Sequence, residues 1–187
     1  MMLSATDQQL VADHEALWSV VNGFFGKFTA LDWSSAHGNQ WTFGEVPYHL
    51  MYFNRLLGDA INAGRSMPQD QLKMVATMQQ LNVWNDSHFA QRPPGYTGMK
   101  AFEEMQETQA VLRDIIQSAD FDSPAWLPLL QVRGWRTVRF VVEYSYFHTW
   151  YHLAEAYLRF YSDHHLPELT TAQHTRALDF YMDVITA

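Results

Sequence analysis

Hydrophobic residues recur every three or four positions along most of this chain, a spacing typical of helices that bury one face. In the first such stretch Leu10, Leu17, Val21 and Phe25 follow it. The same pattern predicts helices over about 6–28, 42–63, 69–89, 98–118, 138–161 and 171–185. Four of these are long, and their one-sided apolar faces favour an all-α fold, an antiparallel four-helix bundle with one or two additional helices.

Capping and turn residues mark where several of these helices begin. Thr42 and Glu45 have the spacing of a capping box, in which both side chains accept hydrogen bonds from free amides. Pro47 is awkward in that register, because it lacks an amide and crowds the preceding turn, so the first turn is weak or the helix starts one or two residues later. Thr97 precedes the third long helix, and Thr137 caps the fourth.

Two stretches leave alternatives open at the level of local structure. The connection 119–136 contains two prolines and Gly134, and it is compatible with a short hairpin-like turn. Residues 82–86 are compatible with a helix or a turn. The loop after the first helix is predicted to run through Asp32, Ser34, Gly38 and Asn39.

Length and composition limit the class of protein. The 187 residues suit a single domain, 1–187, with a core over about 6–161 and an extra C-terminal helix over about 171–185. A hydrophobic content of 48% is too high for a disordered chain. Because cysteine is absent, disulfides, cysteine metal sites and cysteine nucleophiles are excluded, and a thiol used in catalysis would have to come with the substrate.

The charge and the apolar pattern argue against two kinds of partner. The formal net charge is −8 and the Lys and Arg residues are scattered, so no nucleic-acid partner is expected. The polar start does not resemble a signal peptide, and no apolar run approaches the roughly 20 residues that cross a bilayer. A cytoplasmic protein without a membrane partner is therefore expected.

Three histidines carry the candidate chemistry. His148 and His152 are four residues apart in a predicted helix, which places both imidazoles on one face within reach of a single ion. His49 lies on the inward face of a different helix, and bundles assemble metal sites from facing helices. Three imidazoles would leave coordination positions open for water or substrate. The alternative is that these are hydrogen-bonded core histidines without a metal.

Residues near the histidines have both functional and structural interpretations. Glu45 and Glu155 could each accept the second ring N–H of a ligand histidine. The alternative for Glu45 is that it only caps its helix, and the alternative for Glu155 is that it pairs with Arg159. Asn85 and Asp86 are the candidate catalytic residues beside an open metal position, or they simply end a helix. The aromatic residues that could line a pocket, or merely fill the core, are Tyr48, Trp84, Tyr144 and Tyr151.

An ordered set of short motifs resembles the DinB/YfiT-like superfamily. Two segments of this chain are similar to segments of its members: Trp41-Thr42-x-Gly44-Glu45-x-x-x-His49-Leu50, and Arg136-Thr137-Val138 followed by Glu143, His148 and His152. Leu81-x-x-Trp84-Asn85-Asp86, Pro94-Gly95-Tyr96 and Trp126-Leu127-Pro128 fall between them in the same order. The resemblance covers about residues 6 to 160. It implies that His49, His148 and His152 bind one divalent metal ion, and zinc, nickel and iron all suit imidazole ligands.

The resemblance also implies a class of reaction. It suggests a metal-dependent transferase that uses a low-molecular-weight thiol, or a hydrolase, acting on a small molecule and pairing as a homodimer. The alternative is a stress-related dimer that binds metal or an apolar ligand without turnover. An acid or base within reach of the metal would favour catalysis, whereas an apolar wall would favour binding.

Overall fold

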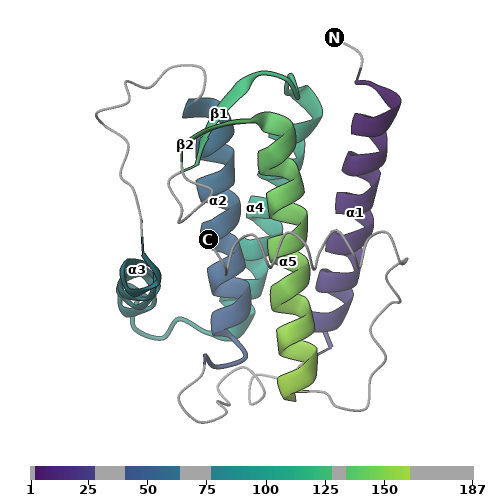
Figure 1. The fold of residues 1–187 in the computed structure, drawn as a ribbon. Helices are drawn as coiled ribbons and strands as arrows, with labels where there is room; N and C mark the ends of the chain where they lie inside the picture. The colour runs from purple at the N-terminus through teal and green to yellow at the C-terminus, as the bar shows by residue number, and fades with distance from the viewer. Residues whose placement is uncertain (1–2, 28–40, 64–76, 128–133, 161–187) are drawn as a thin grey trace.

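Four long helices pack side by side in the computed structural model, which describes residues 3–27, 41–63, 77–127 and 134–160 (Figure 1). The elements in chain order are α1 (Ala5–Phe25), α2 (Glu45–Ala63), α3 (Met78–Ala90), α4 (Gly98–Ser118), β1 (Pro124–Leu127), β2 (Gly134–Thr137) and α5 (Val138–Phe160). The predicted all-α bundle is confirmed, and α3 is an additional helix outside it. The predicted loop over 32–39 and the predicted helix over 171–185 lie outside the described residues.

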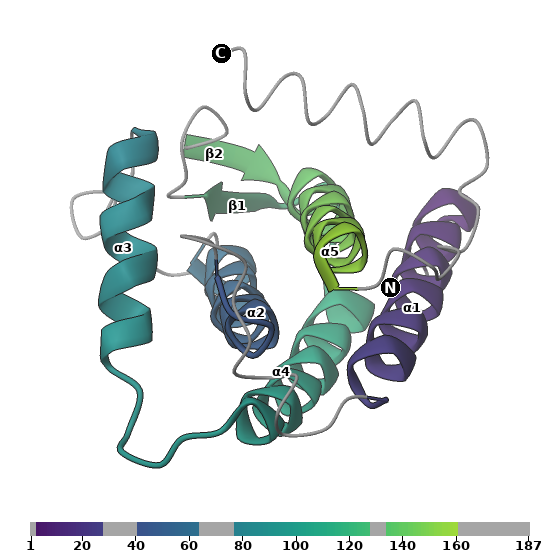
Figure 2. The same cartoon turned by 90° about the horizontal axis from the view of Figure 1, so that it is seen from below.

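The bundle contains both parallel and antiparallel neighbours. Seen end on, α4 and α5 each lie between α1 and α2, which occupy opposite corners (Figure 2). Helices α2 and α4 run in the same direction, since Asn54 donates to Thr108 and Gly58 lies beside Ile115. Helices α1 and α5 are parallel as well, whereas α2 and α5 are antiparallel. The chain must therefore cross back along the bundle between α2 and α4, and that crossover contains α3.

Threonine caps begin three of the helices. The Thr97 hydroxyl accepts from the amide of Lys100, and the Thr137 hydroxyl accepts from that of Phe140, as expected at these two positions. Thr77 and Gln80 form a capping box at the start of α3. Helix α3 therefore begins at Met78, and the part of the prediction over 69–76 lies outside the described residues. Residues 82–86 belong to this helix.

The start of α2 differs from the prediction in a way that explains Pro47. The helix begins at Glu45, three residues after Thr42, and the carboxylate of Glu45 accepts from the amide of Thr42 at 2.7 Å. Pro47 is then the third helical residue. The first four amides of a helix have no intrahelical acceptor, so a proline there removes no hydrogen bond of the helix.

A short hairpin leads into α5, as the sequence of the connection suggested. Strands β1 and β2 are antiparallel, with Pro124 opposite Thr137 and Trp126 opposite Trp135. Gly134 has a φ of 109°, a conformation that side-chain-bearing residues rarely adopt. The hairpin reverses the chain between α4 and α5 at the end of the bundle that contains the first turn of α1 (Figure 1).

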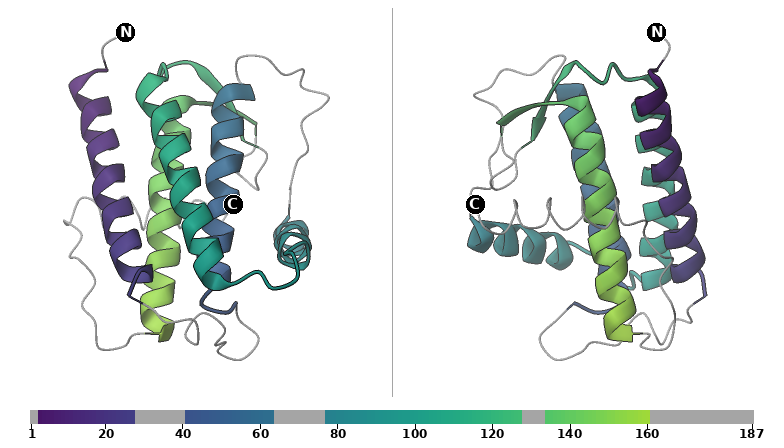
Figure 3. Two further views of the ribbon diagram at one scale, coloured as in Figure 1. Left: turned by 180° about the vertical axis from the view of Figure 1, so that it is seen from behind. Right: turned by 45° about the vertical axis from the view of Figure 1, so that its right-hand side comes forward.

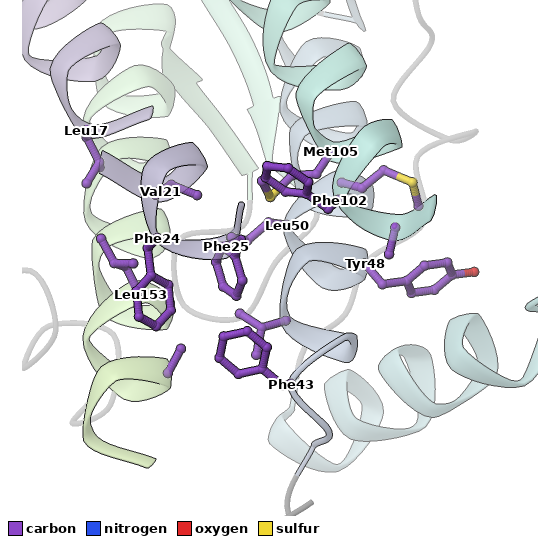
Figure 4. Packing of buried hydrophobic residues seen from close by; sticks show 14 of the residues in the cluster. Leu17, Val21, Phe24, Phe25, Phe43, Tyr48, Leu50, Phe102, Met105 and Leu153 are labelled. Atoms are coloured by element: carbon purple, nitrogen blue, oxygen red, sulfur yellow. The ribbon is translucent and has the colours of Figure 1, made fainter. Parts of the chain in front are cut away.

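Two clusters of buried side chains fill the bundle. One lies toward the end where α2 begins, and its aromatic residues include Phe24, Phe25 and Phe43. Figure 4 shows these rings between α1 and α2, with Tyr48 projecting from α2 away from them. Helix α3 lies across the bundle rather than along it (Figure 3) and packs principally on α2. No helix of the described residues is long and apolar enough to span a membrane.

Candidate metal centre

Three histidines meet between α2 and α5. The Nε2 atom of His148 lies 3.2 Å from the Nε2 of His49 and 3.2 Å from the Nε2 of His152. All three ligand atoms lie within 4.8 Å of one another. Nitrogen ligands about 2.0–2.1 Å from a tetrahedral ion are roughly 3.3 Å apart, so this spacing suits one ion. The three predicted residues are thus brought together and could hold a metal ion.

The antiparallel contact of α2 with α5 sets this geometry. His148 and His152 occupy successive turns of one face of α5, and His49 faces them from α2. One turn further along α2, the ring of Phe53 stacks on His148, with centroids 3.5 Å apart and planes at 16°. The stacked ring leaves His148 little freedom to rotate away from the other two histidines.

The surroundings keep two of the imidazoles neutral. His49 and His152 are buried and His148 is half-buried. Burial lowers the pKa of His49 and of His148 well below the ordinary value, and the neighbouring histidines lower both further. Neutral imidazole is the form that donates a lone pair to a metal, so both rings are ready to act as ligands at neutral pH.

Trp41 covers one side of the three histidines. Its indole lies 4.7 Å from the ring of His49 and 5.5 Å from that of His152, measured between centroids, and it also packs on Phe89 of α3. Sequence reasoning did not place Trp41 in the site, because it precedes α2 and therefore follows no helical periodicity. Its position eight residues before His49, within the segment that resembles the DinB/YfiT-like superfamily, was the available sign.

The two candidate catalytic residues on α3 lie in different environments. Asn85 is buried, and its side chain lies near enough to His49 to raise the pKa of that ring against the stronger lowering by burial. Asp86 is exposed. His88, which the sequence did not single out, packs on Tyr52 with ring centroids 4.1 Å apart and adds to the lowering of the His49 pKa. Its spacing of three residues from Asn85 was the only sign of a shared face.

The two glutamates also separate. Glu155 Oε2 lies 3.4 Å from Nδ1 of His152, which suits a partner behind a ligand. The side chain of Arg159, its other predicted partner, lies outside the described residues. Glu45 caps α2 and pairs with Arg92 at 2.9 Å, so it has the structural role that the sequence also allowed.

Of the four predicted pocket aromatics, Tyr144 and Tyr151 lie nearest the histidines. The ring centroid of Tyr144 is 6.1 Å from that of His148, and that of Tyr151 is 5.1 Å from that of His152. Trp84 packs on His88 instead. Tyr48 lines a cavity of about 350 Å³ beside the first turns of α2 and α4, together with residues that include Glu45, Arg92, Tyr96 and Thr97. None of the three histidines lines this cavity, so it neighbours the centre without opening directly onto the ligand atoms.

Comparison with known protein families shows a match over most of the chain. The sequence model of the DinB superfamily matches residues 9–156, a span that includes α2, α3, α4 and all three histidines. No curated protein matches this chain.

Proposed function

We propose that this chain, which belongs to the DinB superfamily, binds one divalent metal ion through His49, His148 and His152 and acts on a small molecule as a transferase or hydrolase. The observation that supports the metal site is the convergence of three Nε2 atoms, with two separations of 3.2 Å. Such an ion, when bound, lowers the pKa of a water or thiol and makes it a nucleophile at neutral pH. The resemblance noted above favours a low-molecular-weight thiol as the second substrate.

The chain's own residues support this assignment in three ways. The neutral rings of His49 and His148 supply lone pairs without first losing a proton. Phe53 holds the plane of His148. Trp41 excludes water from the side of the site that includes His152, and a lower local dielectric strengthens charge–dipole interactions there.

The first experiment measures the metal content of untagged protein prepared without chelator, by elemental mass spectrometry. We expect about one equivalent of zinc, nickel or iron per chain, and almost none in the His148→Ala/His152→Ala double variant. His88→Ala is the matched control, since it removes a nearby imidazole that does not belong to the converging set. An empty wild-type protein that stays empty after incubation with excess zinc or nickel would contradict the proposal.

A second candidate function is metal or ligand binding without turnover. It is favoured by the aromatic surroundings of the histidines, where Trp41, Phe53 and Tyr144 form apolar walls. The metal-loaded protein should be incubated with a panel of electrophiles and small thiols, and with esters and amides. Thiol transfer or hydrolysis that depends on His148 supports the enzyme, whereas tight binding of panel compounds with no product supports the second candidate.

A further inference from the structure

Helix α3 buries a single amide side chain against the bundle. Asn85 is only 6% exposed, although Val83 and Asp86 beside it are exposed. Its Oδ1 atom is out of contact with solvent and makes no hydrogen bond of normal geometry within the part of the chain that the structure describes. Burying an amide oxygen without a hydrogen-bond partner is unfavourable, so this atom calls for a donor.

The neighbours of Asn85 show which part of α2 it faces. One turn further along α3, His88 packs on Tyr52 and Phe89 packs on Tyr48. On α2, Tyr48 immediately precedes His49, and Tyr52 follows Tyr48 by one turn. The inner face of α3 therefore covers the turn of α2 that carries His49, and Asn85 belongs to that face.

His49 offers an N–H donor for the unpartnered amide oxygen of Asn85. Its Nε2 atom faces His148, so Nε2 is the atom that would bind a metal. A neutral imidazole that ligates through Nε2 carries its proton on Nδ1, and a buried Nδ1–H needs an acceptor. At His152, the carboxylate of Glu155 lies 3.4 Å from Nδ1, on the side of the ring where an acceptor is needed.

We propose that Asn85 is a positioning residue of the metal centre, whose amide oxygen accepts the Nδ1–H of His49 and so fixes the tautomer that presents Nε2 to the ion. This inference rests on the proposed metal site. Helix α3 contributes no ligand, but through Asn85 it supplies the hydrogen-bond acceptor that orients His49, the one ligand from α2. In this arrangement the amide oxygen gains a donor and the Nδ1–H gains an acceptor, which accounts for an asparagine at the one position of α3 that is buried among those whose burial is described.

The test uses cobalt(II) as the probe, because its visible d–d bands report both occupancy and ligand geometry. Wild-type protein is compared with Asn85→Leu, which keeps the volume and removes the acceptor, and with Asn85→Asp, which restores an acceptor of the same shape. Asp86→Asn is the control at the exposed neighbouring position. We expect cobalt affinity to fall about 10–100-fold in Asn85→Leu, to return to the wild-type value or better in Asn85→Asp, and to be unchanged in Asp86→Asn.

A tautomer measurement separates positioning from a general structural role. With zinc bound, the ¹⁵N spectrum of the imidazoles should show a protonated Nδ1 on His49 in wild type and in Asn85→Asp, with an altered shift in Asn85→Leu. If Asn85→Leu folds and binds cobalt with unchanged affinity and spectrum, the inference is wrong while the metal site stands. If Asn85→Leu does not fold, weaker cobalt binding by Asn85→Asp overturns the inference. If wild-type protein binds no cobalt, the proposed function fails with it.

Discussion

The indole of Trp41 lies nearly parallel to the imidazole of His152, with ring centroids 5.5 Å apart and planes at 18°. Trp41 also contacts His49, so one side chain covers ligands from both α5 and α2. Because it stands in the chain just before α2, the cover belongs to the same segment as the first ligand. An ion at this site would lie within a few ångströms of an indole.

Binding of a paramagnetic ion should therefore quench tryptophan fluorescence. We expect nickel(II) or cobalt(II) to reduce the emission of wild-type protein, and most of that reduction to disappear in Trp41→Phe. Trp126→Phe is the control, since Trp126 packs on Trp135 in the hairpin. Equal quenching in wild type and Trp41→Phe at matched occupancy would contradict the position described for Trp41.

Removal of the metal should destabilise the fold. A ligand present at about 100 times its dissociation constant stabilises the folded state by about 2.7 kcal/mol. For a chain of this length that corresponds to a Tm decrease of roughly 5–10 °C on adding a chelator. Calorimetry of wild type with and without chelator measures it, and the Tm of His148→Ala should not respond. A chelator-insensitive Tm in protein shown to contain metal would argue against coupling of the site to the fold.

Metal binding should also protect α3 from hydrogen exchange. Helix α3 packs principally on α2, and its inner face carries Asn85 toward His49. If Asn85 holds a ligand, docking of α3 and binding of the ion favour each other reciprocally. We expect slower amide exchange over residues 81–89 in the zinc-loaded protein than in the metal-free protein. The difference between zinc-loaded and metal-free protein should be lost in Asn85→Leu. A zinc-dependent protection of equal size in wild type and Asn85→Leu would show that α3 docks independently of Asn85.

His14 should make the protein less stable in mild acid. Its ring is buried, Nε2 donates to the carbonyl of Val142 at 2.8 Å, and burial lowers the pKa to about 4 from 6.5. Between these two values the unfolded state binds more protons than the folded state, so stability falls as the pH falls from 6.5 toward 4. The loss from this residue is about 3 kcal/mol over that window.

Urea unfolding at several pH values measures this contribution. His14→Gln keeps a donor for Val142 but cannot titrate, so its stability should depend less on pH between 4 and 6.5 than that of wild type. Above pH 7 neither slope contains a His14 contribution. Parallel pH profiles for the two proteins would mean that His14 has the same pKa in the folded state as in the unfolded state, which would contradict the lowering by burial.

Local signals in the sequence were sufficient for much of the fold. Threonine caps at Thr97 and Thr137, and apolar periodicity between them, place α4 and the start of α5 to within a residue. The spacing of His148 and His152 similarly requires only that α5 be a helix. Pairing with His49 was predicted from its place on the inward face of a second helix and from the family resemblance, since no local pattern determines which helices face each other.

Features that depend on long-range packing were not predictable in this way. The cover by Trp41, the contact of Asn85 with His49 and the parallel course of α2 and α4 all depend on how distant segments meet.

The start of α2 at Glu45 differs from the expected position because two local features compete there. The Thr42–Glu45 contact is retained, but Pro47 is accommodated only when Thr42 stands outside the helix.

The parallel course of α2 and α4 has a consequence for how such a protein can diversify. Parallel neighbouring helices cannot be joined by a tight turn, so the chain returns along the bundle between them, and α3 is part of that connection. Helices α2 and α5, which supply the imidazoles, and helix α3, which faces His49, are thus separate segments of the sequence that can change independently. Substitutions on the inner face of α3 would change the packing around His49 while α2 and α5 keep their sequence.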